Sequence, residues 1–195
     1  MQYAESTSQS VFYQAANIVN LVVRSSCFAN QLTSKVKFQM NPKTIEIVKS
    51  TAPVVKEKGK EITARMYEIA FNERPEYRRF FENTHMKNPE EGKKQAGKLA
   101  ASVYAYASHI DELEKLGDAV EHIAKAHVNT RVIAEQYPVI GECLLAAMKD
   151  VLGEAATPEV MAAWTEAYGN LADIFINREK EIYQEQEQEL RAKFG

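Results

Sequence analysis

A chain of 195 residues, 45% of them hydrophobic, can close one core and fits one domain, or one domain with an extension. Eight glycines and six prolines are too few for a turn-dense sandwich or propeller, which favours an all-α chain. The net charge of −3 offers no basic surface for a phosphate backbone, so no nucleic acid partner is expected.

The chain shows no signal for crossing a membrane or for a disulfide framework. Its longest near-continuous apolar run, residues 18–23, is far shorter than the roughly 20 residues that a bilayer-spanning helix needs, so no transmembrane segment is expected. Cys27 and Cys143 are too few and too far apart for disulfides or a metal cluster, which suits a reducing compartment and predicts a cytoplasmic location. Cys143 is predicted to be a small core residue.

The charge balance changes near residue 40. Residues 1–40 carry three basic side chains against one acidic side chain, whereas residues 41–195 carry 21 basic and 26 acidic groups. An apolar patch over residues 11–23 is consistent with a targeting peptide, an amphipathic anchor or a docking helix. We favour a weakly ordered extension, because the patterns of transit peptides and secretory signals are missing. Met40 is an alternative start of the protein.

Proline after a capping residue predicts where helices begin. Asn-Pro at positions 41–42 and 88–89, and Thr-Pro at 157–158, place a capping side chain before a proline in the first helical turn. The predicted helices cover residues 42–58 with an end at Gly59, 60–72, a short turn through Phe81, 89–110, and a last helix from 158. Residues 184–195 form a polar tail. About six to eight helices in all are typical of a helical bundle or a globin fold.

The four histidines are candidates for metal binding or proton transfer. His127 projects from the apolar face of its helix, whereas the histidines at positions 85, 109 and 122 are expected at the surface. A histidine on an apolar face is more often a hydrogen-bonded core residue than a metal ligand. HxxxH and CxxC spacings are missing, which disfavours zinc, but one histidine suffices if a macrocycle such as haem supplies the other donors.

Three further polar residues lie on or beside apolar helix faces. Gln95 is an amide among hydrophobic residues, Tyr67 lies on a broadly apolar helix, and Glu179 lies at the edge of an apolar arc. Each also has a simpler interpretation. Gln95 can be solvated near its helix start, Tyr67 can be a core tyrosine bonded to a carbonyl, and Glu179 can pair with Arg178 or Lys180 in water.

The sequence resembles the haem domain of flavohaemoglobins and, more closely, the single-domain bacterial haemoglobins related to them. The likeness covers residues 41–183. Its most specific stretches are VEHIAKAH over 120–127, EQYPVIGECLL over 135–145, AWTEAY over 163–168 and FINRE over 175–179. The resemblance implies an all-α globin domain that holds haem b.

The resemblance also implies roles for seven residues. His127 is the proximal iron ligand, and it is tied to Tyr137 and Glu179. On the distal side the resemblance implies a hydrogen-bonding pair, an aromatic that packs on the haem and a leucine that shapes the pocket: Tyr67 with Gln95, Phe81, and Leu99. The segment from 81 to 95 is a few residues longer than the family expectation, and a register shift there would turn Lys94 or Lys98 toward the pocket.

The implied chemistry is oxygen binding followed by oxidation of nitric oxide to nitrate. A carboxylate on the proximal histidine raises its basicity, and the distal pair donates hydrogen bonds, so oxygen release is expected to be slow. The chain ends about a dozen residues past Tyr183, without flavin and nicotinamide domains, so an external reductase is expected. The alternative is oxygen transport or gas sensing without turnover. Both a monomer and a homodimer stay open.

Overall fold

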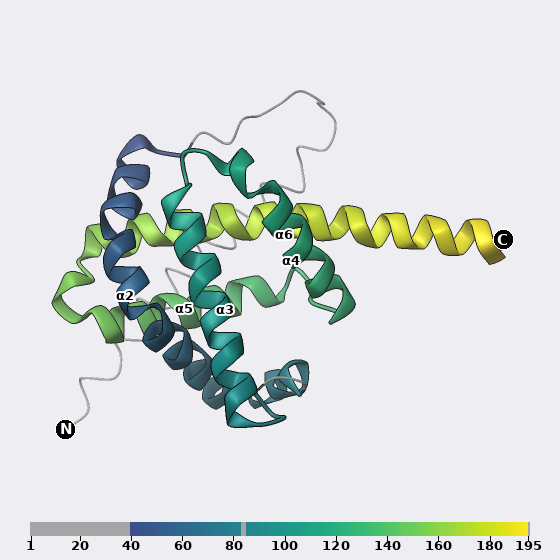
Figure 1. Ribbon diagram of the computed structural model, residues 1–195, viewed down its shortest axis with the longest axis horizontal. Helices are drawn as coiled ribbons and strands as arrows, with labels where there is room; N and C mark the ends of the chain where they lie inside the picture. Colours follow the sequence, from purple (N-terminus) through teal and green to yellow (C-terminus); the bar gives the residue numbers. More distant parts are fainter. Residues whose placement is uncertain (1–39, 83–84, 195) are drawn as a thin grey trace, which may run out of the picture. The chain divides into compact units, whose positions relative to one another are not determined.

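The computed structural model describes residues 40–82 and 85–194, so the alternatives for residues 1–39, with Cys27, lie outside the described residues (Figure 1). Every regular element in these ranges is helical. In chain order they are α2 (Pro42–Glu73), η1 (Pro75–Phe81), α3 (Pro89–Ser108), η2 (Leu113–Leu116), α4 (Gly117–Asn129), α5 (Gln136–Leu152), η3 (Gly153–Ala155) and α6 (Pro158–Phe194).

The three predicted helix starts are confirmed by their caps. The side-chain oxygens of Asn41 and Asn88 each accept a backbone N–H of the first turn at 2.9 Å. Thr157 does the same for α6 at 3.3 Å. A proline occupies the first position of each helix, where its missing N–H leaves no hydrogen bond unmade.

The predicted helix end at Gly59 is wrong, because α2 runs without a break from Pro42 to Glu73. Gly59 is buried where α2 crosses α3, and a Cβ at this position would lie 3.1 Å from the Cβ of Ala100. At the same crossing the Thr63 hydroxyl donates to the Ala96 carbonyl at 2.8 Å. The glycine therefore allows the two helix backbones to approach closely, and does not end a helix.

The helices form two hydrophobic clusters. α2 packs against α3, α5 and α6, while α4 packs against α6 (Figure 1). The first cluster comes mainly from α2, α3, α5 and the start of α6. The second joins α4 to the start of α5 and the middle of α6, and its buried members are Ala124, Val128, Tyr137, Ala172, Phe175 and Ile182. α3 and α4 thus contribute their buried side chains to different clusters.

The structure also bears on the predictions for Cys143 and for the polar tail. Cys143 is 3% exposed, which confirms the prediction of a core cysteine. α6 continues as a helix of exposed residues through positions 184–194, the segment expected to be a polar tail. Within residues 40–82 and 85–194 no helix is both long and apolar enough to cross a bilayer.

Gly141 on α5 makes room for the ring of Tyr168, and replacing it should be costly. A Cβ at position 141 would lie 2.3 Å from Cε1 of Tyr168, whose hydroxyl donates to the Tyr137 carbonyl at 2.7 Å. We expect Gly141→Ala to lower the free energy of unfolding by about 1–3 kcal/mol, measured by chemical denaturation. Gly169→Ala is the matched control, because a Cβ at Gly169 meets nothing within 4 Å. That control should be neutral or stabilising, since alanine is the better helix former. Equal stability of the two variants would contradict this account of Gly141.

Candidate functional site

Two sets of hydrogen bonds hold α4 and the segment after it on α6. The Arg178 guanidinium donates to both carboxylate oxygens of Glu121, at 2.6 and 3.1 Å. Five residues further along α6, the Tyr183 hydroxyl donates to the Val132 carbonyl at 3.0 Å. Because a two-pronged guanidinium–carboxylate contact fixes orientation as well as distance, the apolar face of α4 is held in a defined rotation on α6.

His127 meets two buried oxygen atoms with one ring nitrogen. Its Nδ1 lies 2.7 Å from Oε1 of Glu179 and 3.0 Å from the Tyr137 hydroxyl oxygen. The Tyr137 hydroxyl itself donates to the same Oε1 of Glu179, at 2.5 Å. Because the Tyr137 hydroxyl donates its only proton to Glu179, the Tyr137 oxygen can only accept a hydrogen bond from His127. Nδ1 therefore carries the histidine proton, and the lone pair of the neutral imidazole lies on Nε2.

Glu179 is a deeply buried carboxylate, 3% exposed, and its donors explain how the fold tolerates it. Burial and the neighbouring Glu179 carboxylate raise the pKa of the Tyr137 hydroxyl far above its ordinary value, so Tyr137 remains a donor at every working pH. Arg178, one of the surface partners considered for Glu179, pairs instead with Glu121. The three residues Tyr137, Glu179 and His127 thus form one connected unit, called the proximal triad below.

The outer part of the His127 ring is suited to bind a planar metal macrocycle. The side chain is 34% exposed although its two partners are buried, and nothing in the described part of the chain bonds to Nε2. No three metal-ligating side chains converge within residues 40–82 and 85–194, so a metal at Nε2 would need its other donors from a non-protein group.

Tyr67 and Gln95 are brought together from two helices. Tyr67 on α2 is 5% exposed, and burial raises its pKa to about 12. The Gln95 side chain on α3 lies close enough to the Tyr67 hydroxyl to oppose that rise. Lys94 and Lys98 are exposed, so the register of α3 places Gln95 at Tyr67, while Leu99 is partly buried one turn further on.

Phe81 ends η1 and packs against Tyr67, with ring centroids 5.3 Å apart in an edge-on arrangement. His85 was expected at the surface, and this expectation is wrong. Its ring lies 3.9 Å from the Tyr67 ring, within the same aromatic group. The sequence reasoning missed His85 because a loop residue has no helical periodicity from which its direction can be predicted.

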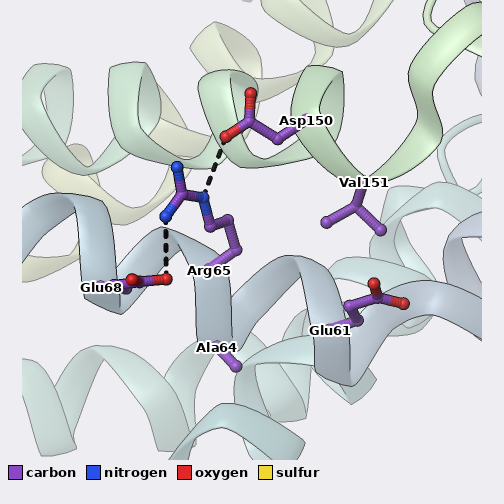
Figure 2. Close-up of a pocket in the computed structure, with 6 residues that line it drawn as sticks. All are labelled: Glu61, Ala64, Arg65, Glu68, Asp150 and Val151. Atoms are coloured by element: carbon purple, nitrogen blue, oxygen red, sulfur yellow. Dashed lines mark hydrogen bonds and ion pairs between the residues drawn. The ribbon is translucent and has the colours of Figure 1, made fainter.

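A surface hollow between α2 and α5 lies apart from the predicted site residues. Figure 2 shows this hollow of about 470 Å³ between α2 and α5, where Arg65 donates to both Glu68 and Asp150. It contains none of the seven predicted site residues. Arg65 pairs with Glu68 and Asp150, and Glu61 pairs with Lys58 at 3.6 Å, so each charged group of the lining already has an ionic partner.

Several relatives of this sequence are flavohemoproteins by name. The globin family model matches residues 64–175. A flavohemoprotein of Bacillus anthracis is 49% identical over 146 residues, which are 75% of this chain and 35% of that protein. A flavohemoprotein of Bacillus subtilis is 43% identical over 150 residues, 77% of this chain and 37% of the relative. The chain therefore spans about a third of the length of these relatives.

Solved structures match about three quarters of the chain. A bacterial globin from Campylobacter jejuni is 33% identical with a TM-score of 0.67, over 74% of this chain and 99% of its own. An engineered carbene transferase from a candidate nitric oxide dioxygenase of Rhodothermus marinus is 34% identical with a TM-score of 0.68. The match covers 75% of this chain and 97% of that protein. A flavohemoglobin of Malassezia yamatoensis with bound FAD and heme is 23% identical with a TM-score of 0.61. The match covers 74% of this chain and 38% of that protein, and it shows a likeness in fold alone.

Proposed function

This chain belongs to the globin family, and on that premise we propose that it holds haem b on His127, binds oxygen reversibly and oxidises nitric oxide to nitrate. The observation that carries the proposal is the proximal triad. Its hydrogen bonds keep the proton of His127 on Nδ1 and leave the lone pair of Nε2 to bind a metal. His127 would hold haem b through Nε2, and the haem iron would supply the site at which a diatomic gas binds.

The proximal triad acts on the histidine. Glu179 accepts from Nδ1–H at 2.7 Å, which makes Nε2 a stronger electron donor and fixes the rotation of the ring. Tyr137 holds the carboxylate oxygen from the other side and so keeps it at Nδ1. The triad therefore combines the two features expected of a strongly donating iron ligand, a basic nitrogen and a fixed direction.

The distal residues act on the gas. In this proposal the Gln95 amide donates to the Tyr67 oxygen, so that the Tyr67 hydroxyl proton is available for a hydrogen bond to bound oxygen. Burial raises the pKa of Tyr67 to about 12, so the hydroxyl stays protonated at physiological pH. In this proposal Phe81 packs on the haem and holds Tyr67 in place, and Leu99 limits the space beside the ligand.

Slow oxygen release favours a reaction over simple transport. In the overall reaction one nitric oxide takes both atoms of one oxygen molecule, and one electron from outside completes the conversion to nitrate. We propose that a reductase outside the globin domain provides this electron.

Removing the Tyr67 hydroxyl should speed oxygen release. A hydrogen bond to a group with charge is worth about 1.5–3 kcal/mol, so we expect Tyr67→Phe to raise the oxygen dissociation rate by about tenfold or more. Stopped-flow displacement of oxygen by carbon monoxide measures this rate. Tyr104→Phe is the control, because Tyr104 lies on α3 beside Lys56, away from the distal residues. Unchanged release in Tyr67→Phe would contradict the distal assignment.

The activity has a direct test. The oxygenated protein, mixed rapidly with nitric oxide, should yield one nitrate per haem and lose its oxygenated spectrum. Fast oxygen dissociation without nitrate would instead identify an oxygen carrier or a gas sensor. A colourless protein after expression with excess haem precursor would overturn both functions.

A further inference from the structure

His85 lies inside an aromatic group that surrounds the predicted distal tyrosine. Its ring centroid is 3.9 Å from that of Tyr67, 5.4 Å from Phe71 and 5.7 Å from Phe81. The first contact is a close tilted stack, and the other two are edge-on. Tyr67 is therefore held between Phe71 and Phe81, with His85 covering part of the ring.

The start of α3 is shaped to receive this imidazole. A Cβ at Gly92 would lie 3.1 Å from Cδ2 of His85, so any larger residue at position 92 would press on the ring. The ring also borders a hollow of about 270 Å³ between α2 and α3, whose lining includes Tyr67, Phe71, Pro89 and Ala96. His85 thus fills space between the two helices that carry Tyr67 and Gln95.

We propose that His85 is a positioning residue for Tyr67, whose ring contact keeps the Tyr67 hydroxyl at Gln95 and on the ligand side. This inference rests on the proposed function, because it assigns Tyr67 as the donor to bound gas. The Tyr67 ring extends from its backbone on α2 to a hydroxyl close to the Gln95 side chain of α3, so a side chain that limits ring rotation also limits where the hydroxyl proton can reach. Without His85 the ring gains the neighbouring hollow as a second place to lie.

The charges around His85 predict that the packing of its ring on Tyr67 depends on pH. The titratable groups that line its hollow are Tyr67 and Glu68 on α2 and Lys93 on α3. Glu68 bonds to Arg65 at 2.8 Å, and Lys93 is itself a cation, bonded to Glu90 at 2.8 Å, whose charge disfavours a nearby imidazolium. Burial lowers the pKa of His85 from its ordinary 6.5, so the folded state favours the neutral ring. The packed position is therefore fully favoured above pH 6.5, and weakens as the pH falls below 6.5 through the lowered pKa.

The infrared C–O stretch of the carbonmonoxy protein tests the inference without measuring activity. A hydrogen bond donated to bound carbon monoxide lowers this frequency, so the native protein should show mainly a low-frequency band at pH 8 and Tyr67→Phe a high-frequency band. His85→Ala should move part of the band to high frequency and raise the oxygen dissociation rate about two- to tenfold, the scale of one aromatic contact. His85→Phe keeps a ring in place and should retain the low-frequency band.

A pH series separates positioning from a general loss of structure. The native band should shift toward high frequency below pH 6.5, while His85→Phe should not shift. His122→Phe, which replaces an exposed histidine on α4, should titrate like the native protein. Identical bands for the native protein and His85→Ala, or a pH shift that persists in His85→Phe, would overturn the inference. A protein that never binds carbon monoxide would instead overturn the proposed function.

Discussion

We expect His127→Ala to purify without a Soret band when it is expressed with excess haem precursor, while the native protein is pigmented. The reason is the arrangement of the proximal triad. Tyr137 and Glu179 are buried on the Nδ1 side of the ring and bond to one another, so neither can replace the missing nitrogen. The measurement is the ratio of Soret to protein absorbance after purification.

Three controls make this loss specific. His122→Ala removes an exposed histidine from the same helix and should leave the Soret band unchanged. Circular dichroism of His127→Ala should still report a helical protein, because the Tyr137–Glu179 bond survives the substitution. Imidazole added to His127→Gly should restore part of the pigment, since a free imidazole can occupy the vacated space. Pigment that is retained unaltered in His127→Ala would refute the assignment of the proximal ligand.

The second large effect is expected for Glu179→Gln. The amide has the shape of the carboxylate and its oxygen can still accept from Nδ1–H, but it lacks the negative charge that strengthens Nε2 as a donor. We expect a lower iron–histidine stretching frequency in the resonance Raman spectrum of the ferrous protein. Haem affinity should fall about tenfold or more, the usual consequence of losing such an outer partner.

The control for this substitution lies two residues further along α6. Glu181 is a surface partner of Arg178, with 63% of its side chain exposed, and Glu181→Gln should leave the stretching frequency unchanged. The comparison is sharp because both variants remove one negative charge from the same helix. If the two variants gave the same spectrum, Glu179 would have no specific effect on the proximal histidine.

Much of the fold could be predicted from local patterns. Asn41, Asn88 and Thr157 begin their helices as predicted, because a cap and a following proline act within one helical turn. The expected all-α globin fold is confirmed by the family match and the similar solved structures. Gly59 shows where such patterns fail. From sequence alone, a glycine that ends a helix cannot be told from one that allows two helices to cross. For Gly59, only the contact with Ala100 distinguishes these cases.

The candidate site divides in the same way. Helical periodicity placed His127 on the apolar face of its helix, and the resemblance to a known family, not spacing, linked it to Tyr137 and Glu179. The roles of these residues as haem contacts stay predictions, tested by the variants above. Neither helical periodicity nor the family resemblance could predict the position of His85, because the direction of its ring depends on Gly92 and Tyr67 from two different helices.

By itself the sequence determined where helices start, which faces are apolar and which histidine lies among hydrophobic residues, since these depend on neighbours within a few positions. Only the tertiary structure decided that Glu179, 52 residues from His127, is buried against Nδ1 and is not a surface carboxylate. The physical reason is that a residue at the edge of an apolar face is solvated or buried according to what packs over it. Here the partner is α4, whose rotation on α6 is set by the Arg178–Glu121 pair and the packing of the second cluster.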